Sequence, residues 1–136
     1  SILNRDLLLT AAMFHDVGKL KELSTFPEND YTDAGNLLGH IVMGVEMLND
    51  QIRQIEGFPV VQANELKHCI LAHHGELEFG SPKKPALVEA LCLSFADNLD
   101  AKMQTMKELL SGVADNSLEW QGYNRLLETN FRKTSC

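Results

Sequence analysis

Four histidine and two aspartate side chains in this sequence are of the types that bind divalent metal ions, and each stands beside a strongly apolar stretch. They are His15, Asp16, His40, His73, His74 and Asp97. Because burying an imidazole or a carboxylate is costly unless the group is paired or bound to a metal, several such groups indicate a common partner. A mixed nitrogen and oxygen ligand set suits Mn, Fe, Co, Ni or Zn better than Ca. The residue types therefore predict a divalent metal site.

Each of these residues also has an ordinary structural explanation when it is taken alone. A single histidine such as His40 on an apolar helix face is more often a hydrogen-bonded core residue than a ligand. Asp97 could be a buried carboxylate that the backbone satisfies. His73-His74, and equally His15-Asp16, could be a solvated helix end. The combination of residues, rather than any one of them, favours the metal site.

Helices are the elements that would position these groups, since apolar residues recur at three- and four-residue steps along most of the chain. We expect helices at about residues 5–14, 32–55, 61–74 and 86–110, and a shorter amphipathic segment at about 118–127. We expect no strand. The fold class is therefore all-α, an irregular helical bundle. The apolar stripe of the second helix comprises Leu37, Leu38, Ile41, Val45, Leu48, Ile52 and Ile55.

These helices assign a place to each candidate ligand. His15 and Asp16 would end the first helix, whose apolar face is too broad for a surface helix, and Gly18 could end it in the left-handed conformation. Thr32 predicts the N-cap of the second helix, which would contain His40. His73-His74 would close the third helix, and Asp97 would lie inside the fourth.

The length and charge of the chain limit the number of domains and the kinds of partner that it can have. A chain of 136 residues fits one domain, and its formal charge of −7 argues against non-specific binding to a phosphate backbone. A polyanionic substrate remains compatible with this charge, because bound divalent metals can invert the local potential.

Cysteine content and hydropathy bear on the compartment. Cys69, Cys92 and Cys136 are odd in number and far apart, so free thiols in a reducing, cytoplasmic setting are expected. No apolar run is long enough to span a membrane, and no signal-peptide pattern opens the sequence.

The string HDVGK resembles the H-D-x-G-K signature of the HD superfamily of metal-dependent phosphohydrolases. The later histidines and Asp97 are similar in type and order to its two-metal branch, which includes the HD-GYP cyclic-dinucleotide phosphodiesterases. The strings HDVGKLKELS, YTDAGNLLGHI, LAHHGELEFGSPKKP and ADNLDAKM closely resemble the HD domain of YhaM-type 3′→5′ exoribonucleases. This likeness covers about residues 11–106.

The resemblance implies a role for each matching residue. His15 and Asp97 would bind a first metal, Asp16 would bridge both metals, and His40, His73 and His74 would complete the second. Lys19 would face the substrate phosphate as a point charge. Asp16 and Lys19 are thus the catalytic candidates. The resemblance also implies two divalent metal ions, with Mn favoured over Fe, Co, Ni, Mg or Zn.

The chain departs from the family pattern in two ways. HD proteins carry a further metal-binding histidine on a helix upstream of the doublet, and no histidine precedes His15 here. YhaM-type proteins place an OB-fold domain before the HD domain. We therefore expect residues 1–136 to be an HD phosphohydrolase domain that lacks both the upstream helix and the OB-fold domain.

Three further positions lie near the pattern without a firm role. His68 is expected at the surface or behind the ligands, and Asp100 could orient a ligand or Lys102. Lys83 and Lys84 lie in the loop of residues 75–85, where they could approach a polyanion or simply be solvated.

The sequence therefore predicts a phosphodiesterase that uses a metal-activated water, acting on RNA or oligonucleotides. A nucleotide phosphomonoesterase is one alternative. A non-catalytic HD module that binds metal and nucleotide is another, and the absence of an upstream histidine favours it. A homo-oligomer is compatible with all three.

Overall fold

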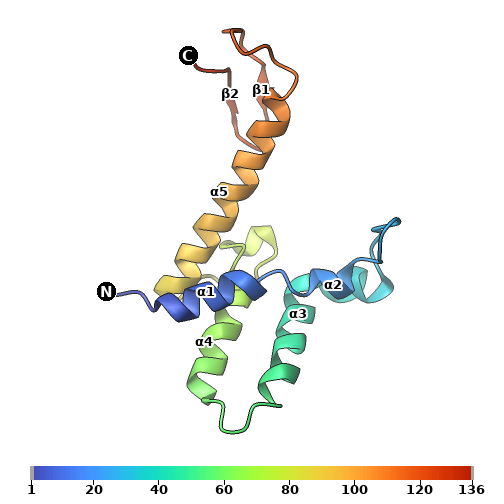
Figure 1. Ribbon diagram of the computed structural model, residues 1–136, viewed down its shortest axis with the longest axis vertical. Helices are drawn as coiled ribbons and strands as arrows, with labels where there is room; N and C mark the ends of the chain where they lie inside the picture. The colour runs from blue at the N-terminus through green and yellow to red at the C-terminus, as the bar shows by residue number, and fades with distance from the viewer. Residues whose placement is uncertain (1, 136) are drawn as a thin grey trace. The chain divides into compact units, whose positions relative to one another are not determined.

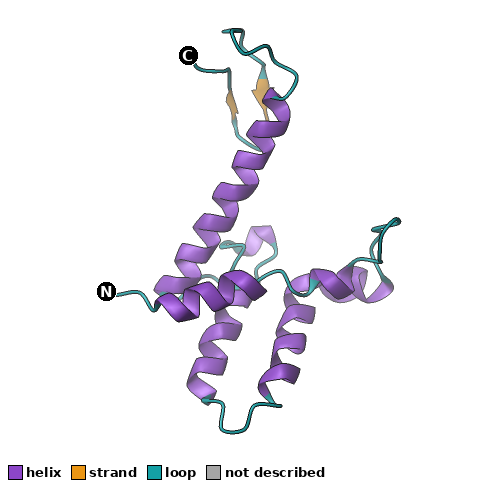
Figure 2. Ribbon diagram, viewed as in Figure 1, coloured by secondary structure: helices purple, strands orange, loops and turns teal. Residues whose placement is uncertain are grey.

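A computed structural model of the protein describes residues 2–135, and the chain divides into two compact units, Ser1–Ala96 and Asp97–Cys136. Cys136, one of the expected free thiols, lies outside the described residues. The elements are α1 (Arg5–Phe14), α2 (Lys19–Glu22), α3 (Asp33–Ile52), α4 (Val60–Leu71), the 3-10 turn η1 (Leu77–Phe79), α5 (Val88–Leu110), β1 (Tyr123–Asn124) and β2 (Thr129–Asn130) (Figure 1). The expected all-α class is confirmed, since helix dominates and strand is confined to one small hairpin (Figure 2). The assignment of residues 1–136 to one HD domain stays a prediction.

The core of the first unit is built from residues of α1, α3, α4 and the start of α5. Its buried members are Ala11, Leu48, Leu66, Cys69, Ile70, Ala72, Ala90 and Leu93. In α1 only Ala11 is fully buried, while Leu7 and Leu8 pack partly against the core and Met13 is 71% exposed. The first helix therefore contributes one edge of the core rather than its centre.

The two cysteines that the structure describes are free thiols, as expected. Burial, with Glu89 and Glu65 nearby, raises the pKa of the Cys69 thiol to about 11. This thiol therefore stays protonated and behaves as a small apolar core residue.

Gly18 has a different role from the one predicted. Its backbone is right-handed, with φ −61°, and it precedes α2, whereas α1 is capped by His15. A Cβ on Gly18 would lie 1.9 Å from the backbone oxygen of His40, and one on Gly35 would lie 2.2 Å from the backbone oxygen of Glu22. These glycines are needed because the segment around α2 packs directly against the backbone of α3.

A break in α3 explains where the predicted apolar stripe was wrong. The N-cap is confirmed, because the Thr32 side chain accepts the N–H of Gly35 at 2.9 Å. Gly39, with φ +73° and ψ 157°, interrupts the helix and shifts its phase. Leu37 and Leu38 are consequently exposed, whereas Ile41 and Leu48 after the break are buried.

Two predicted helix ends also lie elsewhere. The second helix ends at Ile52, so Ile55 follows it and is 55% exposed. The third ends at Leu71 with Ala72 as its C-cap, so His73 and His74 lie in the turn beyond α4. Both histidines are therefore presented by a turn and not by a helix face.

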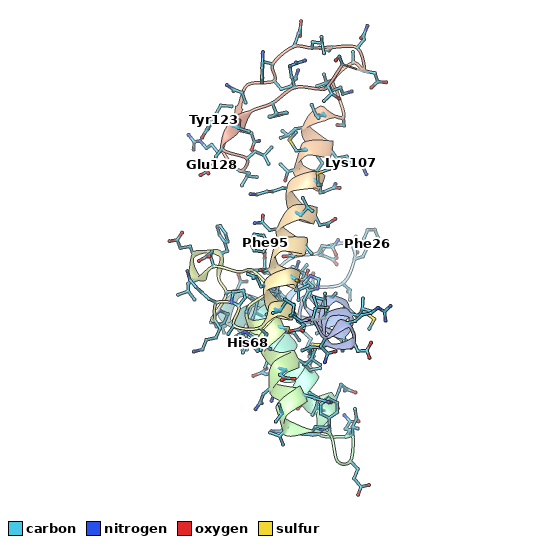
Figure 3. The ribbon with its side chains drawn as sticks, turned by 90° about the vertical axis from the view of Figure 1, so that its left-hand side faces the viewer. Phe26, His68, Phe95, Lys107, Tyr123 and Glu128 are labelled. Carbon is cyan, nitrogen blue, oxygen red and sulfur yellow. The ribbon has the colours of Figure 1, made fainter. Side chains whose placement is uncertain are left out.

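The second unit contains a hairpin where a short amphipathic segment was predicted. β1 and β2 pair antiparallel, with Tyr123 opposite Asn130, and Figure 3 shows Tyr123 and Glu128 on this hairpin. Asn124 Oδ1 accepts the N–H groups of Leu126 and Leu127, and Glu128 takes a positive φ of 52°. This turn chemistry outweighs the weak helical spacing of the leucines. Among residues 2–135 no helix has the length and apolarity needed to cross a membrane.

Replacing Gly18 with alanine should destabilise the protein by roughly 3 kcal/mol, because the new Cβ would overlap the backbone of α3. Gly112→Ala is the matched control, since a Cβ there meets no atom within 4 Å. Chemical denaturation of both variants measures the difference. Equal stabilities for the two would contradict the close-packing role of Gly18.

Candidate metal centre

Two turns and the break in α3 bring four histidines and Asp16 of the first unit together. His15 and Asp16 follow α1, His40 follows the break in α3, and His73 and His74 follow α4. The ligand atoms of His40, His73 and His74 all lie within 4.8 Å of one another, close enough to share one metal ion. The ring centroids of His15 and His73 are 5.1 Å apart. Five of the six predicted ligands therefore gather in one place.

Asp16 stands between the histidines. Its Oδ1 lies 3.4 Å from Nε2 of His40 and 3.7 Å from Nε2 of His73. Its Oδ2 lies 3.4 Å from Nε2 of His15 and 2.8 Å from Nζ of Lys19. One carboxylate thus presents its two oxygens to two different groups of side chains.

In each of the four clustered histidines, Nδ1 has an oxygen acceptor. These Nδ1 contacts are His15 to the Ala12 carbonyl at 2.8 Å, His40 to Glu22 Oε1 at 3.2 Å, His73 to the Ile70 carbonyl at 2.7 Å, and His74 to the Phe79 carbonyl at 2.8 Å. Carbonyl and carboxylate oxygens only accept, so each Nδ1 carries the proton in the neutral ring. The Nε2 atoms are then left with lone pairs, which is the form of histidine that binds a metal.

Three buried atoms at the centre have no hydrogen-bond partner: Asp16 Oδ1, His40 Nε2 and His73 Nε2. All three are acceptors in the tautomers described above, so none can satisfy another. Leaving buried polar atoms unpaired costs about 1–3 kcal/mol each. A divalent cation among them would satisfy all three, and nitrogen with carboxylate oxygen is a suitable donor set for a transition ion. The residues therefore fit a metal.

Electrostatics keep these groups in their metal-binding forms. Burial opposes the charge on Asp16, but the neighbouring His15 and the Lys19 ammonium, which donates to Asp16 Oδ2, outweigh it and hold the pKa of this carboxyl well below its usual range. Burial lowers the pKa of His73 to about 4. At neutral pH Asp16 is therefore ionised and His73 is neutral.

Glu22 belongs to the centre, although its sequence context indicates no role for it. It is 7% exposed, and its Oε1 accepts both the backbone N–H of His40 at 2.8 Å and the ring N–H at 3.2 Å. The residue lies within the string HDVGKLKELS, yet it follows two lysines and looks like part of a solvated turn. Glu22 is buried because α3 packs against α2 in the folded chain.

Other predicted positions have different surroundings. His68 is a half-buried residue of α4 (Figure 3). Its Nε2 atom accepts the N–H of Ala86 at 2.9 Å and so holds the end of the loop of residues 75–85 against α4. In that loop Lys84 pairs with Glu76. Asp97 is the first residue of the second unit, and its role as a ligand stays a prediction, as do those of Asp100 and Lys102 in the same unit.

The chain is similar to known proteins over the region that contains this centre. The family profile named HD domain matches residues 2–102. The chain is 46% identical over 114 residues to the 3′-5′ exoribonuclease YhaM of Bacillus velezensis, 45% over 114 residues to that of Bacillus subtilis, and 43% over 114 residues to that of Bacillus licheniformis. Each alignment covers 82% of this chain and 35% of the relative, so the chain spans about a third of these curated relatives. No solved structure shows a significant match.

The buried His73 should make metal-free protein sensitive to acid. Between pH 6.5 and about 4, His73 is protonated in the unfolded chain but stays neutral in the folded chain. The free energy of unfolding therefore falls as the pH falls. The full shift corresponds to about 3 kcal/mol. Asp16 titrates below this window and does not mask the effect.

Urea unfolding of EDTA-treated protein at pH 7.5, 6 and 5 tests this. His73→Gln should lose less stability between the highest and lowest pH than wild type does. An identical pH dependence in the two proteins would contradict the depressed pKa of His73.

Proposed function

The chain belongs to the HD-domain family, and we propose that it is a metal-dependent phosphodiester hydrolase that acts in the manner of a 3′→5′ exoribonuclease. The observation that supports this best is the convergence of Asp16 Oδ1, His40 Nε2 and His73 Nε2, buried and without donors. An anionic ligand would not fill such a place, whereas a divalent cation would. The metal-binding side of the centre is therefore the basis of the proposed activity.

The two oxygens of Asp16 suit a bridging role. Oδ1 faces His40 and His73, and His74 lies beside them, so these residues would hold one ion. Oδ2 faces His15, which would contribute to holding the other. When bound, divalent ions polarise phosphoryl oxygens and make water a better nucleophile at neutral pH.

Lys19 supplies a positive charge next to this centre. Its Nζ lies 2.8 Å from Asp16 Oδ2, and its side chain is 48% exposed. The contact keeps the ammonium close to where a phosphate would bind, while the exposure leaves it able to turn toward the substrate. Lys19 would therefore stabilise negative charge that develops on the phosphoryl oxygens.

RNA is the proposed substrate because the relatives named above are exoribonucleases. The charge of −7 offers little attraction for a long polyanion. We therefore propose that this region binds the scissile phosphodiester through its metals and Lys19.

Incubation of 5′-labelled RNA with Mn²⁺-loaded protein should yield progressively shorter labelled products. Asp16→Asn should lower the rate by on the order of 100-fold or more, because it weakens both metal sites at once. Asp50→Asn, at an exposed carboxylate of α3, is the matched control and should retain wild-type activity. Removal of metal with EDTA should abolish cleavage, and Mn²⁺ should restore it.

Two outcomes would refute the nuclease. Cleavage of p-nitrophenyl phosphate in preference to bis-p-nitrophenyl phosphate would indicate the phosphomonoesterase instead. Metal binding without turnover of RNA or either ester, with Asp16→Asn behaving as wild type, would indicate the non-catalytic module.

A further inference from the structure

Glu22 is connected to His40 by two hydrogen bonds that use one oxygen. Its Oε1 accepts the backbone N–H of His40 and the ring Nδ1–H of the same residue. We propose that Glu22 is the positioning residue of the metal centre: it fixes the ring orientation and tautomer of His40 and thereby sets the affinity for the metal. This inference rests on the metal site of the proposed function.

The break in α3 creates the opportunity for the first bond. Inside a continuous helix, the N–H of His40 would donate to the carbonyl four residues earlier. The conformation of Gly39, φ +73° and ψ 157°, turns that N–H toward Glu22 instead. The Glu22 carboxylate therefore caps the second half of α3 from another helix, at the end where the helix dipole favours negative charge.

The second bond determines which nitrogen of His40 faces the centre. Because Glu22 accepts the Nδ1–H, the lone pair is on Nε2, and this atom lies 3.4 Å from Asp16 Oδ1. A carboxylate behind a ligating imidazole also raises the basicity of the ligand nitrogen. Glu22 thus contributes both geometry and charge.

Glu22 is itself held in place. Its backbone oxygen accepts the N–H of Thr32 at 2.9 Å and the Thr32 hydroxyl at 3.1 Å, and Gly35 packs against the same carbonyl. With its side chain 9% exposed, the carboxylate has little freedom to turn away. The residue is a rigid support for His40.

The other three histidines are oriented by backbone carbonyls, which substitution cannot remove. Among the described residues, Glu22 is therefore the acceptor behind a clustered histidine that mutation can test. Glu89 is a matched control: it is also 7% exposed and also accepts a backbone N–H, that of Asn4, rather than a histidine.

The test measures the Zn²⁺ affinity of the whole chain by competition with a chromophoric chelator, and the ring N–H signals of Zn²⁺-loaded protein by ¹H–¹⁵N NMR. Glu22→Ala should weaken Zn²⁺ binding by about 10–100-fold and abolish the slowly exchanging Nδ1–H signal of His40. Glu22→Gln, whose amide oxygen can still accept both bonds, should keep that signal at a shifted position and lose less affinity. Glu89→Ala should lower the melting temperature and leave the affinity unchanged.

Several results would overturn the proposal. These are wild-type affinity in Glu22→Ala, an equal loss in Glu89→Ala, or an unshifted His40 ring proton in Glu22→Gln. If Glu22→Ala does not fold, the position of the His40 Nδ1–H signal in Glu22→Gln tests the proposal instead. Neither readout uses RNA, so a wild-type protein that binds zinc but cleaves no RNA would refute the proposed function alone.

Discussion

Lone pairs that point at one another without a donor between them are the constraint around which the first unit is built. Asp16 Oδ1, His40 Nε2 and His73 Nε2 repel one another in the absence of a cation. Such an arrangement persists only where the surrounding structure holds each group from behind. Here the support comes from carbonyls of local turns, from Glu22 and from Lys19.

The glycines of the first unit make this support compact. Gly18 and Gly35 allow the segment around α2 to rest on the backbone of α3, and Gly39 breaks α3 where His40 must face inward. Close backbone contact brings Glu22 within reach of His40. Packing and ligand geometry therefore depend on the same few positions.

Residue types predicted more of the centre than helix periodicity did. The bounds of α1 and the Thr32 cap followed from local signals, and His15, Asp16, His40, His73 and His74 do lie together. The break at Gly39 was missed because tertiary packing, and not the neighbouring sequence, determines whether a glycine adopts a positive φ. Glu22 was missed for a related reason: nothing local distinguishes a buried carboxylate from a solvated one. The hairpin replaced an amphipathic segment because two short strands leave almost no periodic signal.

The string HDVGK mixes two kinds of information. His15, Asp16 and Lys19 are the candidates for chemistry, whereas Gly18 is needed for packing, because a Cβ at this position would lie 1.9 Å from the backbone oxygen of His40. A homologue that keeps the glycine but replaces the doublet can retain this architecture without the ion, and a homologue that replaces the glycine must rebuild the contact between α2 and α3. Used as a search pattern, the string therefore filters for fold at one position and for reactivity at the others, and matches should be weighted accordingly.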